Sequence, residues 1–270
     1  MSFPIDVLLN GQEQYWADQT QQHDLGARGY MPDGRSYRYV LLATSASAND
    51  YAKDVGRGLF AYNPPVALTV TIGGIGDTEV TGTVSGARST DDLAGGFLGS
   101  FTSTYRHLMS GIKSNTSGTT PVIQLERALE VSIVAATTYV VADAYHKVCN
   151  LNYSRDAGDF FEFIPGVCIA KQDKDGTAMA SGDYTWIQSW GVCLCIIAND
   201  WEGASALEKM VRFDGAGVCQ TIPNGATYDN YAHSQIAGYQ FPSTAAVPGV
   251  TGTGSNLVRT SNFIYLMITP

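Results

Sequence analysis

The sequence predicts an all-β protein, a sandwich or partly closed barrel with glycine-rich loops and an extended N-terminal arm. Three observations carry this prediction. Runs of strand length with period-2 alternation recur from Val66 to Ile268, helix-period runs are short, and 29 glycines in 270 residues supply tight turns. We therefore expect less than about a fifth of the residues to be helical.

The densest apolar and aromatic stretch, 180–200, is expected to be the central strand, bent at Gly191. Before this glycine, one side of the period-2 pattern carries Tyr184, Trp186, Gln188 and Trp190. After it, two apolar series oppose each other, Val192, Leu194 and Ile196 against Cys193, Cys195 and Ile197. Aromatic strand faces are most often core, and a carbohydrate- or base-binding platform is the alternative interpretation.

Further strands are expected on either side of the central one. Two runs, 66–72 and 78–84, flank a glycine cluster and predict a hairpin, because Glu79 stands where the third glycine of a dinucleotide fingerprint would fall. A last strand over 263–268 should direct Ile264, Leu266 and Ile268 inward. Short helices are possible at 121–129 and 205–210. The Asp-x-Asp-Gly stretch from Asp173 lacks the other calcium ligands and predicts a surface turn.

The charge balance excludes a non-specific grip on nucleic acid. The net charge is −9, the charged fraction is 15%, and the basic residues show no cluster that could bind phosphates. The longest uninterrupted apolar run is 192–198, which is far below the ~20 residues of a membrane-spanning helix. We expect a soluble chain without a cleaved signal, with neither nucleic acid nor membrane as a partner.

The cysteines are expected to be buried free thiols made in a reducing cytoplasm. They are odd in number and lie mostly inside apolar runs: Cys149, Cys168, Cys193, Cys195 and Cys219. Cys193-x-Cys195, with His146 near Cys149, does not supply the ligand spacing of a zinc site, so no metal or other cofactor is predicted. The thiols should react only after unfolding.

Residues 1–60 are predicted to form an N-terminal arm, a hairpin and a linker, and residues 61–270 a β-rich domain that could divide near residue 150. Pro32, Asp33 and Gly34 indicate the hairpin turn. The apolar side chains of the arm need another surface to cover them, so the arm should hold neighbouring subunits or a larger shell. We expect this interface to include Phe3, Ile5, Val7, Leu8, Leu9, Tyr15, Trp16, Arg28, Arg35, Tyr37 and Arg38.

One alternative accompanies this interpretation. The arginines could instead be solvated hairpin residues paired with Asp24 and Asp33. If the arm is an interface, deleting residues 1–20 should leave a folded β-domain that no longer assembles.

No catalytic motif occurs in the chain, so we predict that it is not an enzyme. G-x-S-x-G, H-E-x-x-H and P-loop patterns are all missing, and the four histidines are scattered. A carboxylate dyad needs no sequence signature, which leaves pairs such as Asp91 with Asp92 or Asp159 with Glu162 open.

Two stretches, HDLGARGYMPDGRSYRYVLL at 23–42 and ASGDYTWIQSWGVCLC at 180–195, resemble a family of tailed-bacteriophage virion proteins. Members combine an "LG, x, DG, x, YRY" hairpin with a later "AGxYxWxQxxG" strand and a glycine-rich β-tail. The chain departs from the commonest wording of the first motif at Ala27, Arg28, Met31 and Pro32.

The resemblance implies a non-enzymatic capsid decoration or cement protein. Such a protein would be made in the host bacterial cytoplasm and would bind the outer surface of the phage head. Its partners would be the major capsid protein and copies of itself, with a homotrimer favoured because it suits three-fold positions of an icosahedral shell. A tail-fibre or receptor-binding β-module that recognises host glycan is the alternative, and an exposed aromatic cluster would distinguish it.

Overall fold

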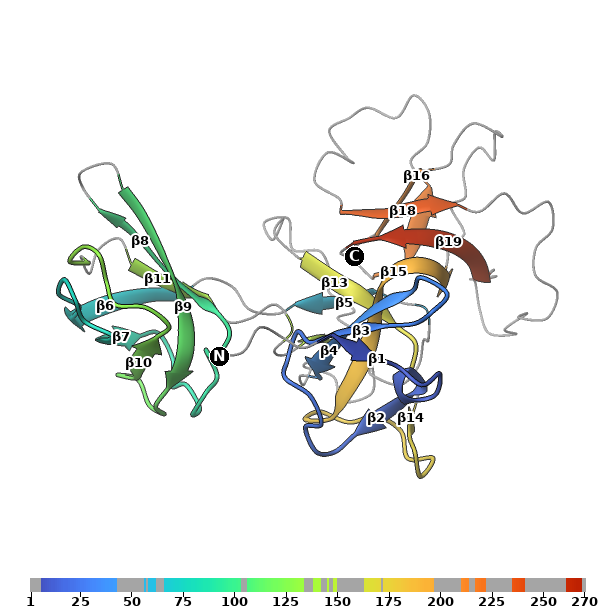
Figure 1. Ribbon diagram of the computed structural model, residues 1–270, viewed down its shortest axis with the longest axis horizontal. Helices are drawn as coiled ribbons and strands as arrows, with labels where there is room; N and C mark the ends of the chain where they lie inside the picture. The colour runs from blue at the N-terminus through green and yellow to red at the C-terminus, as the bar shows by residue number, and fades with distance from the viewer. Residues whose placement is uncertain are drawn as a thin grey trace. The chain divides into compact units, whose positions relative to one another are not determined.

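The computed structural model describes residues 6–42, 56, 58–61, 66–102, 106–133, 138–141, 145, 148–149, 163–170, 172–196, 210–213, 217–221, 235–240 and 261–268. The protein is all-β, as predicted. In these residues the helical content is one short 3-10 turn, η1 (Glu13–Tyr15). The chain divides into two compact units, one formed by residues 1–3 and 63–146 and the other by residues 4–62 and 147–270 (Figure 1).

The first unit is a closed antiparallel barrel, drawn in teal to green in Figure 1. Its strands in barrel order are β10 (Val122–Leu125), β7 (Glu79–Val84), β6 (Val66–Ile72), β11 (Thr138–Val141), β8 (Phe97–Thr102) and β9 (Arg106–Asn115). Aliphatic side chains from alternating positions, among them Leu68, Leu98 and Ile112, fill the interior with no exposed surface.

The second unit contains a 13-stranded mixed sheet. Its main path runs through β1 (Val7–Leu8), β3 (Arg28–Tyr30), β4 (Ser36–Leu41), β15 (Tyr184–Ile196), β19 (Ser261–Met267), β18 (Ile236–Gln240), β16 (Met210–Phe213) and β17 (Cys219–Thr221). The strands off this path are β2 (Trp16–Asp18), β5 (Gly58–Ala61), β12 (Val148–Cys149), β13 (Phe163–Cys168) and β14 (Gln172–Asp173).

Strand β15 is the centre of this sheet, so the prediction of a central strand in 180–200 is confirmed. It pairs with β4, β19, β13 and β2. Within this continuous strand Gly191 has a φ of +89°, which other residues rarely adopt, and a Cβ there would lie 3.1 Å from the Arg35 Cα, a tight contact. β15 pairs with β4 from Tyr184 to Trp190 and with β19 from Trp190 to Ile196.

Several local predictions are confirmed. Strands β6 and β7 form the expected hairpin, and β3 and β4 form the one that turns at Pro32–Gly34. Ile264 and Leu266 of β19 point into the core with no exposed surface. Asp173 closes the expected turn, where its carboxylate accepts backbone bonds from Asp175 at 2.9 Å and Thr177 at 2.8 Å.

Two predictions about segments are wrong. The proposed helix at 121–129 is strand β10 followed by a turn, because Ile123 and Leu125 alternate into the barrel core. The expectation that the arm and hairpin reach out of the β-domain is also wrong for residues 6–42, which supply β1 to β4 of the sheet. Leu9 and Ala17 are buried there, so deleting residues 1–20 should destabilise the sheet. The expected linker at 43–58 and helix at 205–210 lie almost wholly outside the described residues.

Candidate interaction surfaces

The stretches 23–42 and 180–195 are neighbours in the sheet, although 137 residues lie between them. Strand β4 pairs antiparallel with β15, from Tyr184 opposite Leu41 to Trp190 opposite Ser36. Their aromatic rings form a cluster with ring centroids 5.0 to 6.0 Å apart: His23, Tyr39, Tyr184 and Trp186. The hairpin and the central strand thus build one packed element.

This cluster belongs to the core and is not an exposed platform. Tyr39 is fully buried and Trp186 is 2% exposed. Burial raises the pKa of the Tyr39 hydroxyl to about 12, although the hydroxyl accepts a bond from the Gln22 backbone N–H at 3.1 Å. Of the rings in the cluster, those of Tyr39 and Trp186 therefore cannot stack on a ligand.

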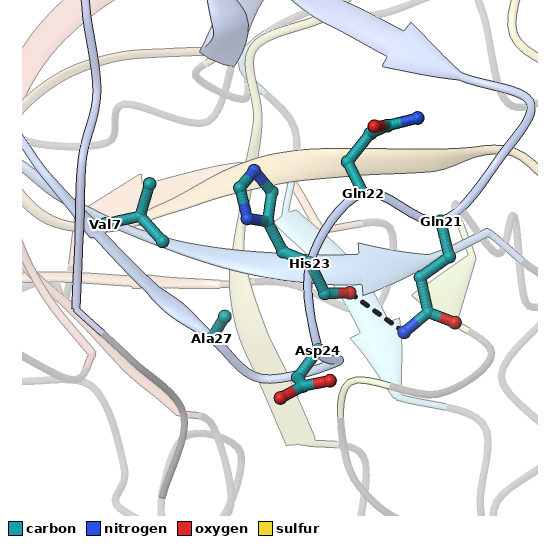
Figure 2. A pocket seen from close by; sticks show the side chains of 6 residues that line it. All are labelled: Val7, Gln21, Gln22, His23, Asp24 and Ala27. Carbon is teal, nitrogen blue, oxygen red and sulfur yellow. Dashed lines mark hydrogen bonds between the residues drawn. The ribbon is translucent and has the colours of Figure 1, made fainter. Parts of the chain in front are cut away.

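A shallow pocket of about 420 Å³ lies at the edge of this cluster. Figure 2 shows the residues that line it, which are Val7, Gln21, Gln22, His23, Asp24 and Ala27. The Gln21 side-chain amide donates to the His23 carbonyl at 2.8 Å and so fixes the loop between β2 and β3. The lining offers two amides, one imidazole and one carboxylate, which can bind a polar ligand but include no nucleophile beside a base.

The residues predicted from sequence to form an interface do not form one surface. Tyr37 is fully buried and Leu9 is 2% exposed, both in the chain's own core beside Trp186, so neither can contact a partner. Val7 and Trp16 are half-buried, whereas Leu8 and Tyr15 are 58% and 43% exposed. Phe3 and Ile5 lie outside the described residues.

Two of the three predicted interface arginines, Arg35 and Arg38, bond to groups near the hairpin. Arg35 forms an ion pair with Asp33 at 2.8 Å, and this hydrogen bond lowers the pKa of the Asp33 carboxyl. Arg38 donates to the Gly26 carbonyl at 3.4 Å and stands directly opposite Arg28 across the β3–β4 ladder. The alternative of a hairpin arginine paired with a nearby acid therefore holds for Arg35.

An exposed apolar face, which sequence analysis missed, covers the outer side of strands β15, β19, β18 and β16. We name it the outer apolar face. Eight large hydrophobic side chains on it are 37 to 49% exposed: Val192, Leu194, Met210, Ile236, Tyr239, Phe263, Tyr265 and Met267. The opposite side of the same strands packs against the core through Cys193, Cys195, Ile264, Leu266 and Ala237.

The register places these side chains in cross-strand rows. One row runs through Val192, Tyr265, Tyr239 and Met210, which are successive partners on the four strands. Leu194 stands opposite Phe263 in the next row. On the other flank Trp190 stands opposite Met267, and its ring meets that of Tyr265 edge-on at 5.8 Å. The face is therefore continuous across four strands.

The four strands hold a single charged residue, Arg212 of β16. Its side chain is 7% exposed and donates to the Gln220 amide oxygen at 2.8 Å. A signal of this face was present in β15 and β19, because both are apolar at successive positions and not only at alternate ones. In an antiparallel sheet such a strand is expected to be covered on both faces.

The barrel carries a smaller exposed apolar patch on β11, β8 and β9. Tyr139 and Met109, 39% and 71% exposed, flank Gly99 in one row, and Phe97 lies in the adjacent part of β8. A Cβ at Gly99 would meet nothing within 4 Å, so the row is open at its middle.

Four cysteines, Cys168, Cys193, Cys195 and Cys219, are buried free thiols, as predicted, and the side chain of Cys149 is outside the described part. Burial raises the pKa of the Cys168 thiol to about 12. Hydrogen bonds to Cys193 and Cys219, with burial, raise the pKa of Cys195, whose Sγ lies 3.7 Å from that of Cys193. Thiols held protonated in this way are poor nucleophiles.

Within the described ranges, no group of three or more His, Cys, Asp or Glu side chains is placed to hold a metal ion. The same ranges contain no helix long and apolar enough to cross a membrane. Of the suggested acidic pairs, Asp91 accepts a backbone bond from Asn115 at 3.3 Å, and Asp159 and Glu162 lie outside those ranges.

Comparison with protein-family models, curated proteins and solved structures finds no match to the chain.

Proposed function

We propose that this chain is a non-enzymatic virion structural protein, a decoration or cement protein that binds the outer surface of a phage head and stabilises it. Its partners are the major capsid protein and copies of itself in a closed homo-oligomer, with a trimer favoured. The function needs no cofactor and no chemistry.

One observation carries the proposal beyond the sequence resemblance. The two stretches with that resemblance pair over the length of β4 and share the His23, Tyr39, Tyr184 and Trp186 cluster. Motifs far apart in sequence that meet in one packed element are constrained together by the fold. This supports a common origin better than two short matches at unrelated places would.

The surface chemistry supports the same class of function. An enzyme needs titratable groups gathered in a cleft, with pKa values tuned by their neighbours. Here the strongly raised pKa values belong to buried thiols and tyrosines that pack the core. The large exposed feature is apolar, and apolar surface of this extent is typical of proteins that assemble.

Purified particles test the proposal. Virions from a phage that encodes this chain should contain it at a fixed ratio to the major capsid protein, measured by quantitative mass spectrometry. Electron microscopy should show added density on the head that disappears when the gene is deleted. Heads of the deletion phage should lose DNA at lower temperature and recover stability on addition of the purified chain. Density on the tail tip alone would contradict the proposal.

Glycan recognition by a receptor-binding module is the second candidate, and the pocket at His23 is the observation that favours it. Its amides and carboxylate suit sugar hydroxyls, and His23 is a half-buried ring at its edge. Glycan-array binding that is lost on Asp24→Ala would support this function. Absence of binding to host-cell polysaccharide would leave the capsid role preferred.

A further inference from the structure

We propose that the outer apolar face is the contact between copies of this chain, with the faces turned toward one another about the axis of a closed homo-oligomer. The proposal deepens the proposed function and rests on it for the expectation of a closed oligomer. It assigns to the oligomer contact a different set of residues from those expected in the N-terminal segment.

The packing of the strands gives the first reason. The inner sides of β15 and β19 are covered by the core, where Cys195, Ile264 and Leu266 have no exposed surface. On the outer sides, Leu194, Phe263 and Tyr265 stay 37 to 45% exposed. Burying a large apolar side chain contributes ~1.5 to 3 kcal/mol, so a second apolar surface packed against this face would be bound favourably.

The charge distribution gives the second reason, and it selects a second copy as that cover. Each chain carries a net charge of −9, so two copies repel through most of their surface. Arg212 is the only charged residue in the four strands, and it is buried and bonded to Gln220. Two copies that meet through this face bring no exposed like charges together.

The extent of the face gives the third reason. Because large side chains bury ~150 to 250 Å² each, eight of them at these exposures leave roughly 600 Å² uncovered on each chain. Packing these faces together at the axis of the oligomer would bury roughly 600 Å² on each chain, which is at the lower end of the ~600 to 1,000 Å² per partner of stable specific interfaces. The side chains include Tyr239, Phe263 and Tyr265, types enriched at interface cores, and Tyr265 stands at the centre of the row.

A matched pair of arginine substitutions tests the proposal in the full-length chain. Tyr265→Arg puts a charge at the centre of the outer apolar face, whereas Tyr139→Arg puts one on the barrel at nearly equal exposure, 37% against 39%. We expect sedimentation and light scattering to show an oligomer for wild type and Tyr139→Arg. For Tyr265→Arg we expect self-association weakened at least about 30-fold. Far-ultraviolet dichroism and the melting curve control for folding.

A labelling measurement keeps the test decisive if Tyr265→Arg misfolds. Val192→Cys and Met109→Cys place a thiol on the outer apolar face and on the barrel, at positions that are 40% and 71% exposed in the single chain. Under oligomer conditions, maleimide should label Val192→Cys at least about tenfold more slowly than Met109→Cys, if the hidden thiol is exposed in one-tenth of the molecules or fewer. Dilution to monomer should restore fast labelling.

The outcomes separate this proposal from the proposed function. Wild type that is monomeric at micromolar concentration, or Tyr265→Arg that stays oligomeric, would overturn the assignment of the face. A monomeric wild type that binds heads, with Tyr265→Arg unable to bind them, would also overturn it and leave the decoration function standing. An oligomer that depends on Tyr265 but never binds heads would support the assignment and contradict the decoration function.

Discussion

The barrel and the open sheet differ in how their strands cover apolar side chains. The barrel is built from one contiguous stretch, 63–146, and its six strands close so that every strand has two neighbours. The open sheet joins strands from both sides of that stretch, and β15 pairs with β4 before it in sequence and with β19 at the end. Closure turns the apolar side of the barrel strands toward one interior core, whereas the open sheet has two faces to cover.

The two units also differ in composition and in exposed apolar surface. All four tryptophans and all five cysteines lie outside 63–146. The outer apolar face belongs to the open sheet, while the barrel exposes a smaller apolar patch. The barrel packs its apolar side chains into its own interior, whereas the open sheet leaves one apolar face exposed.

Deleting the barrel tests most directly whether the open sheet folds without it. Ala61 of β5 and Val148 of β12 are cross-strand partners, so the ends left by deleting 63–146 are already adjacent. We expect a chain with Asn-Gly in place of these residues to close a short hairpin there and to keep the open sheet folded. Tryptophan fluorescence should report a single cooperative unfolding transition. Loss of that transition would show that the sheet needs the barrel.

A pair of glycine substitutions probes the open sheet against the barrel wall. A Cβ on Gly238 of β18 would lie 1.9 Å from the Tyr265 carbonyl oxygen, and its φ is +151°. Gly238→Ala should therefore lower the free energy of unfolding by ~3 kcal/mol or more. Gly99→Ala in the barrel meets nothing within 4 Å and should change it by less than ~1 kcal/mol. Urea titration of both variants measures the difference.

Two amide side chains, one from each unit, differ in burial and provide a comparison on a smaller scale. In the barrel, Asn115 is 3% exposed, accepts from the Leu93 N–H at 2.8 Å and donates to the Ser89 carbonyl at 2.9 Å. Asn115→Ala should cost about 2 to 3 kcal/mol, because the Leu93 donor stays buried without its partner. Gln235 bonds both backbone groups of Ile164 but is half-buried.

Water can replace the amide of Gln235, so Gln235→Ala should cost only about 1 kcal/mol. Thermal unfolding of the two alanine variants gives the ranking. An equal loss of stability in both variants would mean that burial of the amide does not determine the cost of removing it.

The buried thiols make the stability of the open sheet depend on pH in the alkaline range, which is the smallest of these expected effects. Folding raises the pKa of Cys168 from 9.0 to about 12 and raises that of Cys195 through its neighbours Cys193 and Cys219. Above pH 9 the unfolded chain loses thiol protons that the folded chain keeps, so stability falls as pH rises. We expect a decrease of about 1 kcal/mol between pH 9 and 10 for each thiol, which approaches about 1.4 kcal/mol per pH unit well above pH 9.

Unfolding in urea between pH 9 and 10, followed by tryptophan fluorescence, measures this slope. Tyrosines of the unfolded chain, with a pKa of about 10, begin to ionise in the same range, so the thiol contribution is obtained by difference from a control variant. Cys168→Ser is the control, because serine stays neutral there and should remove the Cys168 contribution to the slope. An unchanged slope in that variant would exclude Cys168 as a source.

The sequence predicted the parts of the fold whose signal is local. The alternation in 180–200, the Pro32–Gly34 turn and the glycine-flanked runs at 66–72 and 78–84 each led to the correct strand or hairpin. The N-terminal segment was misread because β1 and β2 have only two and three residues. Their pairing partners include β15, far away in sequence, so no local pattern identifies them.

The candidate surface was harder to predict than the fold. Leu9 and Tyr37 look like uncovered side chains in a polar segment, but long-range pairing buries them. Conversely, Leu194 and Tyr265 look like core residues in apolar runs, and the register leaves them outside. Which of two apolar sides faces the core depends on neighbouring strands, and periodicity within one strand carries no information about that choice.

The outermost strands of the open sheet also limit how this protein can polymerise. The strands with a single neighbour are β1, β12, β14 and β17, and in the described structure they span two or three residues each. Edges this short present too few free backbone groups to template a strand from another molecule. A protein crowded at high local concentration can therefore associate through side-chain surfaces without growing into amyloid-like ribbons.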